Sequence, residues 1–122
     1  MTLEQMKQRV MFQTGNDAAD LGDFLPYLVD YLNDGYDRLL FAHCGMHLSD
    51  GGVFQPLRHD KSTPELPDWA HEAIAEWATW LICRNGAPGR QNRGLLVRAS
   101  FEETERRLRA QGQPQNFHNL PR

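Results

Sequence analysis

The sequence has 122 residues, of which 40% are hydrophobic and 24% are charged, which suits one modest domain and leaves little room for separate cofactor and substrate lobes. Its formal net charge of −3 argues against a protein that grips nucleic acid through the phosphates, because such proteins carry a large basic excess. No apolar run approaches the roughly 20 residues that cross a bilayer, the first residues do not resemble a signal peptide, and two cysteines cannot build a disulfide framework, so we expect a compact cytosolic protein with no membrane partner.

The first predicted helix covers residues 3–14. Thr2, followed three residues later by Gln5, forms a capping-box pattern in which each side chain bonds the backbone N–H of the other residue. Gly15 is typical of the end of a helix. Apolar residues spaced three or four apart give this helix one core-facing stripe, formed by Leu3, Met6 and Val10.

The second predicted helix, residues 24–44, has the clearest pattern. Asp23 is placed to cap it, Pro26 lies in the first turn, where its missing N–H costs little, and Gly45 ends it. A glycine in the middle of a helix costs up to about 1 kcal/mol relative to alanine, so we expect another helix to cross closely at Gly35. The residues of its core-facing stripe are Leu25, Leu28, Val29, Leu32, Tyr36, Leu39, Leu40 and His43.

A second face of this helix is aromatic. It carries Phe24, Tyr27 and Tyr31, close to Arg38. Two interpretations stay open: the rings contact a second molecule, because a helix with two apolar faces often touches two neighbours, or they pack against the segment that follows.

That segment, residues 45–67, is a long connection rich in Gly, Ser, Asp and Pro. Connections of this length without regular structure are uncommon in compact domains unless they are functional or disordered. Val53, Phe54 and Leu57 are apolar enough to anchor it, to form a short β-hairpin across residues 50–52, or to contact another subunit or a partner protein.

The third predicted helix begins after Pro67, with Asp68 as its cap, and ends near Arg84. Its shared apolar face consists of Ala70, Ala73, Ile74, Trp77 and Leu81. Residues 85–89 form a strong break, and the fourth predicted helix follows over residues 90–110. Its apolar stripe is narrow, which is typical of a helix at the edge of a bundle, and consists of Val97, Phe101 and Leu108.

After Gly112 we expect the chain to be extended, with Phe117 and Leu120 available to reach a partner. The chain therefore divides into a helical domain, residues 1–112, and an extended C-terminal tail, residues 113–122. The pattern predicts four helices and, apart from the possible short hairpin, no strand. The expected fold is therefore all-α, a small four-helix bundle.

The charge is distributed unevenly along the chain. Residues 1–83 hold five basic and thirteen acidic side chains, a balance of −8, whereas residues 84–122 hold eight arginines and three glutamates, a balance of +5. Such a molecule can align head to tail with copies of itself, because complementary fields set orientation and association rate. The alternative is that the arginines simply solvate one helix.

Nothing in the sequence predicts catalysis, a metal or a cofactor, so we expect the protein not to be an enzyme. His43 and His47 are four residues apart, a spacing that shares a metal on one helix, but Gly45 interrupts that helix. A His-Glu pair at His71 begins like the helical zinc-protease motif, but Ala75 stands where the second histidine belongs.

Two segments carry a resemblance to a known family. Residues 31–39 read Tyr-Leu-Asn-Asp-Gly-Tyr-Asp-Arg-Leu, within a helix that follows a short helix and a polar turn. Residues 65–74 read Glu-Leu-Pro-Asp-Trp-Ala-His-Glu-Ala-Ile, at the start of the third helix. Together with the glycine-rich turn and the basic last helix, these segments resemble the head–tail connector (adaptor) proteins of tailed bacteriophages over roughly residues 2–110. The long connection and the tail match no motif of that family.

The resemblance implies a small structural subunit that assembles with itself as a ring, usually a dodecamer, beneath the portal protein. Such a ring continues the DNA channel and offers a docking surface to the next neck or tail-completion protein. The implied location is the virion neck, between capsid and tail, after synthesis in the host cytoplasm. DNA would pass without specific binding, which agrees with a mildly negative net charge.

The competing interpretation is a small helical nucleic-acid-binding or regulatory module that uses the arginine-rich last helix. For the ring, arginines of the last helix would meet acidic residues of the adjacent subunit, namely Asp30, Asp34 and Asp37. The candidate residues for subunit or partner contact are Phe24, Tyr27, Tyr31, Arg38, Val53, Phe54, Leu57, Arg98, Arg106, Arg107, Arg109, Phe117 and Leu120.

Overall fold

The protein is described here from a computed structural model, which covers residues 1–15 and 22–118, with residues 112–118 described by their backbone alone. Within these ranges the secondary structure is entirely helical. The four α-helices are α1 (Leu3–Gln13), α3 (Leu28–Cys44), α4 (His71–Cys83) and α5 (Pro88–His118). Single turns of 3-10 helix precede α3 and α4, namely η1 (Leu25–Tyr27) and η2 (Asp68–Ala70). The predicted all-α class is therefore confirmed.

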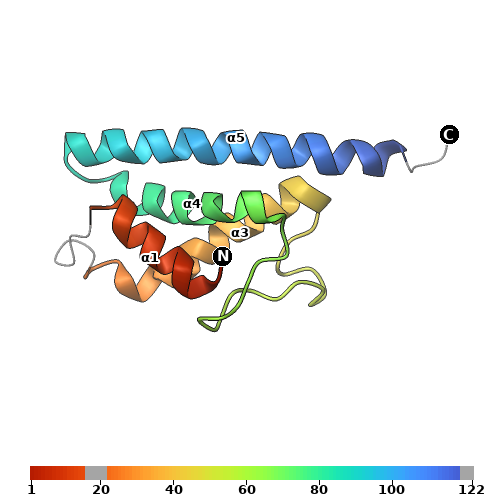
Figure 1. Cartoon of the computed structure of the whole chain (residues 1–122), viewed down its shortest axis with the longest axis horizontal. Coiled ribbons are helices and arrows are strands. Elements are labelled where there is room, and N and C mark those ends of the chain that lie inside the picture. The colour runs from red at the N-terminus through yellow and green to blue at the C-terminus, as the bar shows by residue number, and fades with distance from the viewer. Residues whose placement is uncertain (16–21, 119–122) are drawn as a thin grey trace.

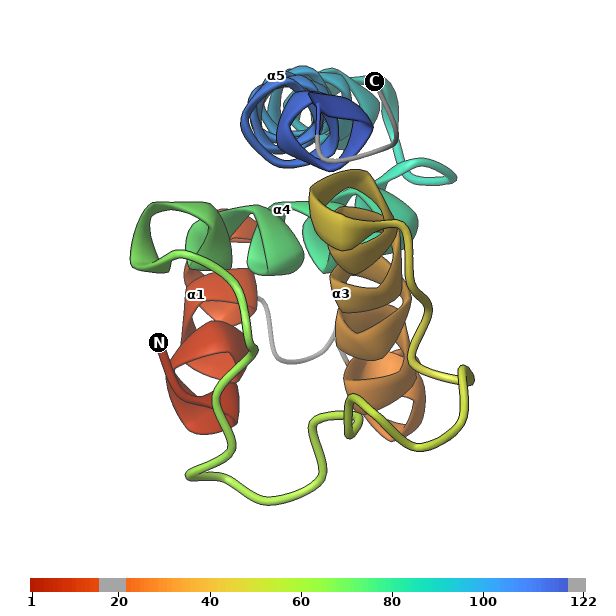
Figure 2. The ribbon, with the colours of Figure 1, turned by 90° about the vertical axis from the view of Figure 1, so that its right-hand side faces the viewer.

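The helices are arranged in layers (Figure 1). α5 forms one outer layer, α4 and the C-terminal part of α3 lie against it, and α1 lies on the other side of α4, as Figure 2 shows along the axis of α5. α4 contacts all three other helices, and a helix that is apolar on every side belongs at such a central position. Its buried residues accordingly point in several directions and include Ala73, Ile74, Ala75, Trp77, Ala78, Thr79 and Ile82.

The start of α1 agrees with the sequence prediction. The Gln5 backbone N–H donates to Thr2 Oγ1 at 3.2 Å, and the Thr2 backbone N–H donates to Gln5 Oε1 at 2.9 Å, so the capping box is formed. The predicted apolar stripe of α1 is fully buried against the other helices, with Leu3, Met6 and Val10 all at 0% exposure.

The starts of the next two helices differ from the prediction. Neither Asp23 nor Asp68 caps a helix, because α3 and α4 are each entered through a 3-10 turn without a side-chain cap. In η1 the Tyr27 backbone N–H donates to the Phe24 carbonyl oxygen at 2.9 Å. This tighter winding takes Leu25 off the stripe of α3, and Leu25 is 50% exposed rather than in the core.

The predicted close crossing at Gly35 is confirmed. A Cβ atom added to this residue of α3 would lie 2.9 Å from the Cβ of Trp77 in α4, closer than two such carbon atoms pack. α4 and α5 meet in a similar way at Gly94, where an added Cβ would lie 3.0 Å from the Cβ of Cys83. Glycines thus bring α4 close to the helices on both of its sides.

The last helix is longer than predicted. α5 ends at His118, and its C-terminal end extends past the other elements (Figure 1). The extended tail predicted from residue 113 is therefore wrong for residues 113–118, because a glycine such as Gly112 lowers helix propensity by about 1 kcal/mol without excluding the helical conformation. Residues 119–122 lie outside the described residues.

The connection of residues 45–67 forms turns, and the β-hairpin allowed for across residues 50–52 is not observed there. The Asp50 backbone N–H donates to the His47 carbonyl oxygen at 3.0 Å, and the Val53 N–H donates to the Asp50 carbonyl oxygen at 3.3 Å. Consecutive i to i+3 bonds of this kind wind the chain locally and leave its backbone groups unpaired with a second strand.

Candidate functional site

Arg38, which the sequence assigns to an aromatic contact face, lies at the junction of three helices. Its guanidinium stacks over the ring of Trp77 in α4, 4.4 Å from the ring centroid, and lies 5.4 Å from the centroid of Phe101 in α5. Its Nη2 also pairs with Glu105 Oε2 at 3.2 Å, and only 14% of the Glu105 side chain is exposed. The side chain therefore joins α3, α4 and α5 of its own chain.

The acidic residues expected to face an adjacent subunit are mostly used within the chain. Asp34 accepts a hydrogen bond from Trp77 Nε1 at 2.7 Å. Asp37 accepts one from the Leu48 backbone N–H at 2.7 Å, and its other oxygen lies 2.9 Å from His47 Nδ1. Asp30 and Asp34 are both exposed, whereas Asp37 is partly buried, so Asp30 and the unbonded part of Asp34 keep the exposure that the prediction requires.

The long connection is attached to α3 at a second point. The Leu57 backbone N–H donates to Asn33 Oδ1 at 2.7 Å, and Asn33 Nδ2 donates to the Leu57 carbonyl oxygen at 2.9 Å. The Leu57 side chain is 1% exposed, so its assignment to an intermolecular contact is wrong, because this side chain fills the core. Phe54 is half-buried against the core, whereas Val53 is 61% exposed.

The predicted aromatic face spans η1 and the start of α3, and its rings are divided between the core and the surface. The rings of Tyr27 and Tyr31 are stacked, with centroids 6.3 Å apart. Phe24 and Tyr31 pack partly against the core, while Tyr27 is 54% exposed. Of these three rings, Tyr27 is therefore the one that remains exposed enough to contact another molecule.

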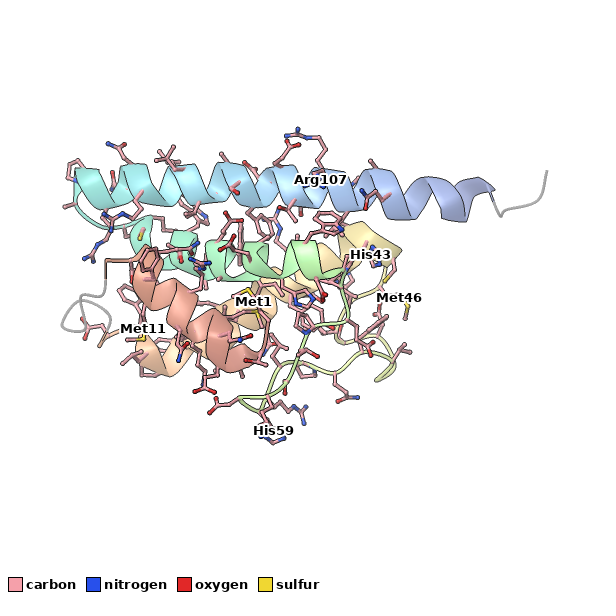
Figure 3. The ribbon with its side chains drawn as sticks, in the orientation of Figure 1. Met1, Met11, His43, Met46, His59 and Arg107 are labelled. Atoms are coloured by element: carbon pink, nitrogen blue, oxygen red, sulfur yellow. The ribbon has the colours of Figure 1, made fainter. Side chains whose placement is uncertain are left out.

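The arginines of α5 are extensively paired with neighbours in the same chain. Arg98 lies 4.9 Å above the ring of Trp80, and Arg107 lies 4.3 Å above the ring of Trp69. Figure 3 shows Arg107 on α5, above α4. Arg106 pairs with Glu103 one turn earlier, and Arg109 is exposed.

Two predicted contact residues belong to the last part of the chain. Phe117 lies within α5, close to its C-terminal end. Leu120 lies outside the described residues.

The groups with possible site chemistry are dispersed. Among the described side chains, residues 1–15 and 22–111, no three of His, Cys, Asp or Glu are close enough together to hold a metal ion. His47 Nδ1 pairs with Asp37, whereas His71 is buried and its Nε2 lies 2.8 Å from the Leu66 carbonyl oxygen. Burial raises the pKa of the Cys83 thiol, an effect that Arg90 and Arg93 partly oppose, so this thiol is less easily ionised than a free one.

Several exposed apolar side chains were missed by the sequence analysis. Leu95 and Leu96 of α5 are 54% and 73% exposed, and Phe12 of α1 is 66% exposed. A signal was present, because these residues lie off the apolar stripes of their helices, at positions where a purely solvated face carries polar residues. For Leu25 the sequence carries no such signal, because the exposure of this residue depends on the 3-10 turn η1.

Comparisons with protein-family models, with curated proteins and with solved structures each find no match to this chain. In the part of the chain that the structure describes, no helix combines the length and the apolar character that crossing a membrane requires.

Proposed function

We propose that this protein is a structural subunit of a bacteriophage neck, where copies form a ring that joins the portal to the next neck or tail component and continues the DNA channel. The proposal combines the sequence resemblance over residues 31–39 and 65–74 with one structural observation. That observation is that α5 has a positive charge balance, whereas the elements on its other side have a negative one.

The layers differ in charge as follows. α5 carries six arginines and three glutamates, a balance of +3. The layers below it, within residues 1–15 and 22–83, carry five basic and eleven acidic side chains, a balance of −6. A subunit with two unlike faces forms heterologous contacts, and such contacts close into rings when the rotation between subunits allows it. Complementary charge favours that orientation over face-to-face pairing of like layers.

The alternative, a nucleic-acid-binding module, is less well supported. Phosphate binding uses guanidinium and ammonium groups that are not already engaged by neighbouring side chains of the protein. Arg98 and Arg107 instead cover tryptophan rings, and Arg106 pairs with Glu103. The overall net charge of −3 also opposes the approach of a polyanion.

The test is the mass of the purified protein, alone and after mixing with the portal protein encoded in the same genome, by light scattering and native mass spectrometry. We expect a closed ring in at least one of these conditions, bound to the portal in the mixture. A monomer that stays monomeric over a wide concentration range and ignores the portal would refute the assignment. Micromolar DNA binding at moderate salt, with a steep salt dependence, would instead support the nucleic-acid-binding alternative.

A further inference from the structure

The outer face of α5 carries an apolar pair on an otherwise hydrophilic helix. Gly94, Phe101 and Leu108 form the buried side of α5. Leu96 lies two residues after Gly94, and at about 100° per residue its side chain is on the opposite side of the helix, where it is 73% exposed. Its neighbour Leu95 is 54% exposed. Single exposed leucines are ordinary, whereas contiguous exposed apolar surface marks sites of interaction.

A second exposed apolar surface lies where α1 ends and η1 begins, and we call it the α1–η1 patch. It consists of Met11, Leu25 and Tyr27, which are 36%, 50% and 54% exposed. Met11 and Leu25 line one apolar hollow together with Phe24 and the core residues Val10, Leu28 and Ile82. Figure 3 shows Met11 on the side of the body away from α5.

The two surfaces cannot meet within one chain. The outer face of α5 points away from the other layers, whereas the α1–η1 patch belongs to the layer on the far side of α4 (Figures 1 and 2). Contact between them requires a second copy, with the α5 face of one copy against the patch of the next.

Charge favours that pairing. Asp23 and Asp30 are exposed and flank the patch in sequence, two residues before Leu25 and three residues after Tyr27. The leucine pair lies between Arg93 and Arg98 on α5, the layer with a positive balance. Stacking α5 on α5, or patch on patch, would instead bring like charges together.

We propose that the contact between adjacent copies of this chain is formed by Leu95 and Leu96 of one copy and the α1–η1 patch of the next. The inference rests on the self-assembly proposed above and adds which two surfaces meet. Because the surfaces differ, each copy contributes both halves, and the contact repeats from copy to copy until the ring closes.

The experiment uses two double variants of the full chain, L95S/L96S and L25S/Y27S, measured in whichever condition the wild type assembles, alone or on the portal. All four side chains are at least half exposed, so both variants should keep the wild-type circular dichroism spectrum. We expect the concentration for half-assembly to rise about tenfold or more in each, the loss that truncating central interface residues causes. Val53→Ser is the matched control, because Val53 is 61% exposed on a different surface, and it should assemble as the wild type does.

Mixing the two variants tests the unlike character of the contact. The L95S/L96S copy keeps an intact patch and the L25S/Y27S copy keeps an intact α5 face, so an equimolar mixture should form heterodimers and no larger species. The inference is overturned if the folded variants assemble as the wild type does, if the mixture forms no heterodimer, or if Val53→Ser abolishes assembly. In those cases the proposed function stands, because the wild type still assembles. If the wild type assembles in neither condition, the proposed function fails and this contact fails with it.

Discussion

Replacing Gly35 by alanine tests the closest helix crossing in the molecule. At a position that accepts it, a glycine-to-alanine change stabilises a protein by about 0.4–1 kcal/mol. At Gly35 the new Cβ would lie 2.9 Å from the Cβ of Trp77, an atom fixed to the backbone of α4. Overpacking a well-filled core costs about 1–3 kcal/mol, so we expect the free energy of unfolding to fall by about 1 kcal/mol.

The assay is a urea titration followed by circular dichroism, which gives the free energy of unfolding for each variant. Gly89→Ala is the control, because an added Cβ there meets no atom within 4 Å and the variant should gain about 0.4–1 kcal/mol. The reasoning is refuted if Gly35→Ala is as stable as Gly89→Ala, since the crossing would then have room for a methyl group.

Three further predictions concern single side chains. Arg38→Met keeps most of the apolar stem but removes the charge from above Trp77, so the free energy of unfolding should fall by roughly 1–3 kcal/mol, measured by urea titration, and lysine should restore only part of it. Asn33→Ala removes both hydrogen bonds to the Leu57 backbone, so limited proteolysis should cut within residues 45–67 faster while the helical circular dichroism signal persists. Burial raises the pKa of Glu76 more than the Ser100 hydroxyl lowers it, so the folded state holds this proton more tightly than the unfolded chain, and stability is lost as the pH rises. Glu76→Gln should therefore be more stable than the wild type at neutral pH, and the difference should vanish well below pH 4.5, as urea midpoints at both pH values would show.

Local patterns predicted the helices well because they depend on residues that are near in sequence. The capping box of Thr2 and Gln5 needs only a spacing of three residues, and the buried stripe of α1 follows from the helical period. Gly35 was informative for a similar reason, since a glycine in mid-helix has few explanations other than a close neighbour. The entry turns of α3 and α4 were missed, because Asp23 and Asp68 fit the composition of a cap and only the tertiary packing selects the 3-10 turn.

The candidate contact residues were predicted less successfully, because their partners are distant in sequence. Arg38 looked available for another subunit, yet it covers Trp77, which lies 39 positions later in the chain. Leu57 looked like a loop residue and proved to be core, because Asn33 fixes its backbone against α3. The sequence shows whether a side chain is charged or apolar. Which residue it contacts depends on which helices become neighbours in the fold.

The covering of tryptophan rings by arginine has an optical consequence. All three indoles lie beneath a guanidinium group, Trp77 beneath Arg38 in α3, and Trp80 and Trp69 beneath Arg98 and Arg107 in α5. Lifting α5 away would uncover Trp69 and Trp80 together, while the cover of Trp77 by Arg38 belongs to another helix. The intrinsic fluorescence of the protein is therefore a built-in reporter of how α5 is seated, with no dye attached.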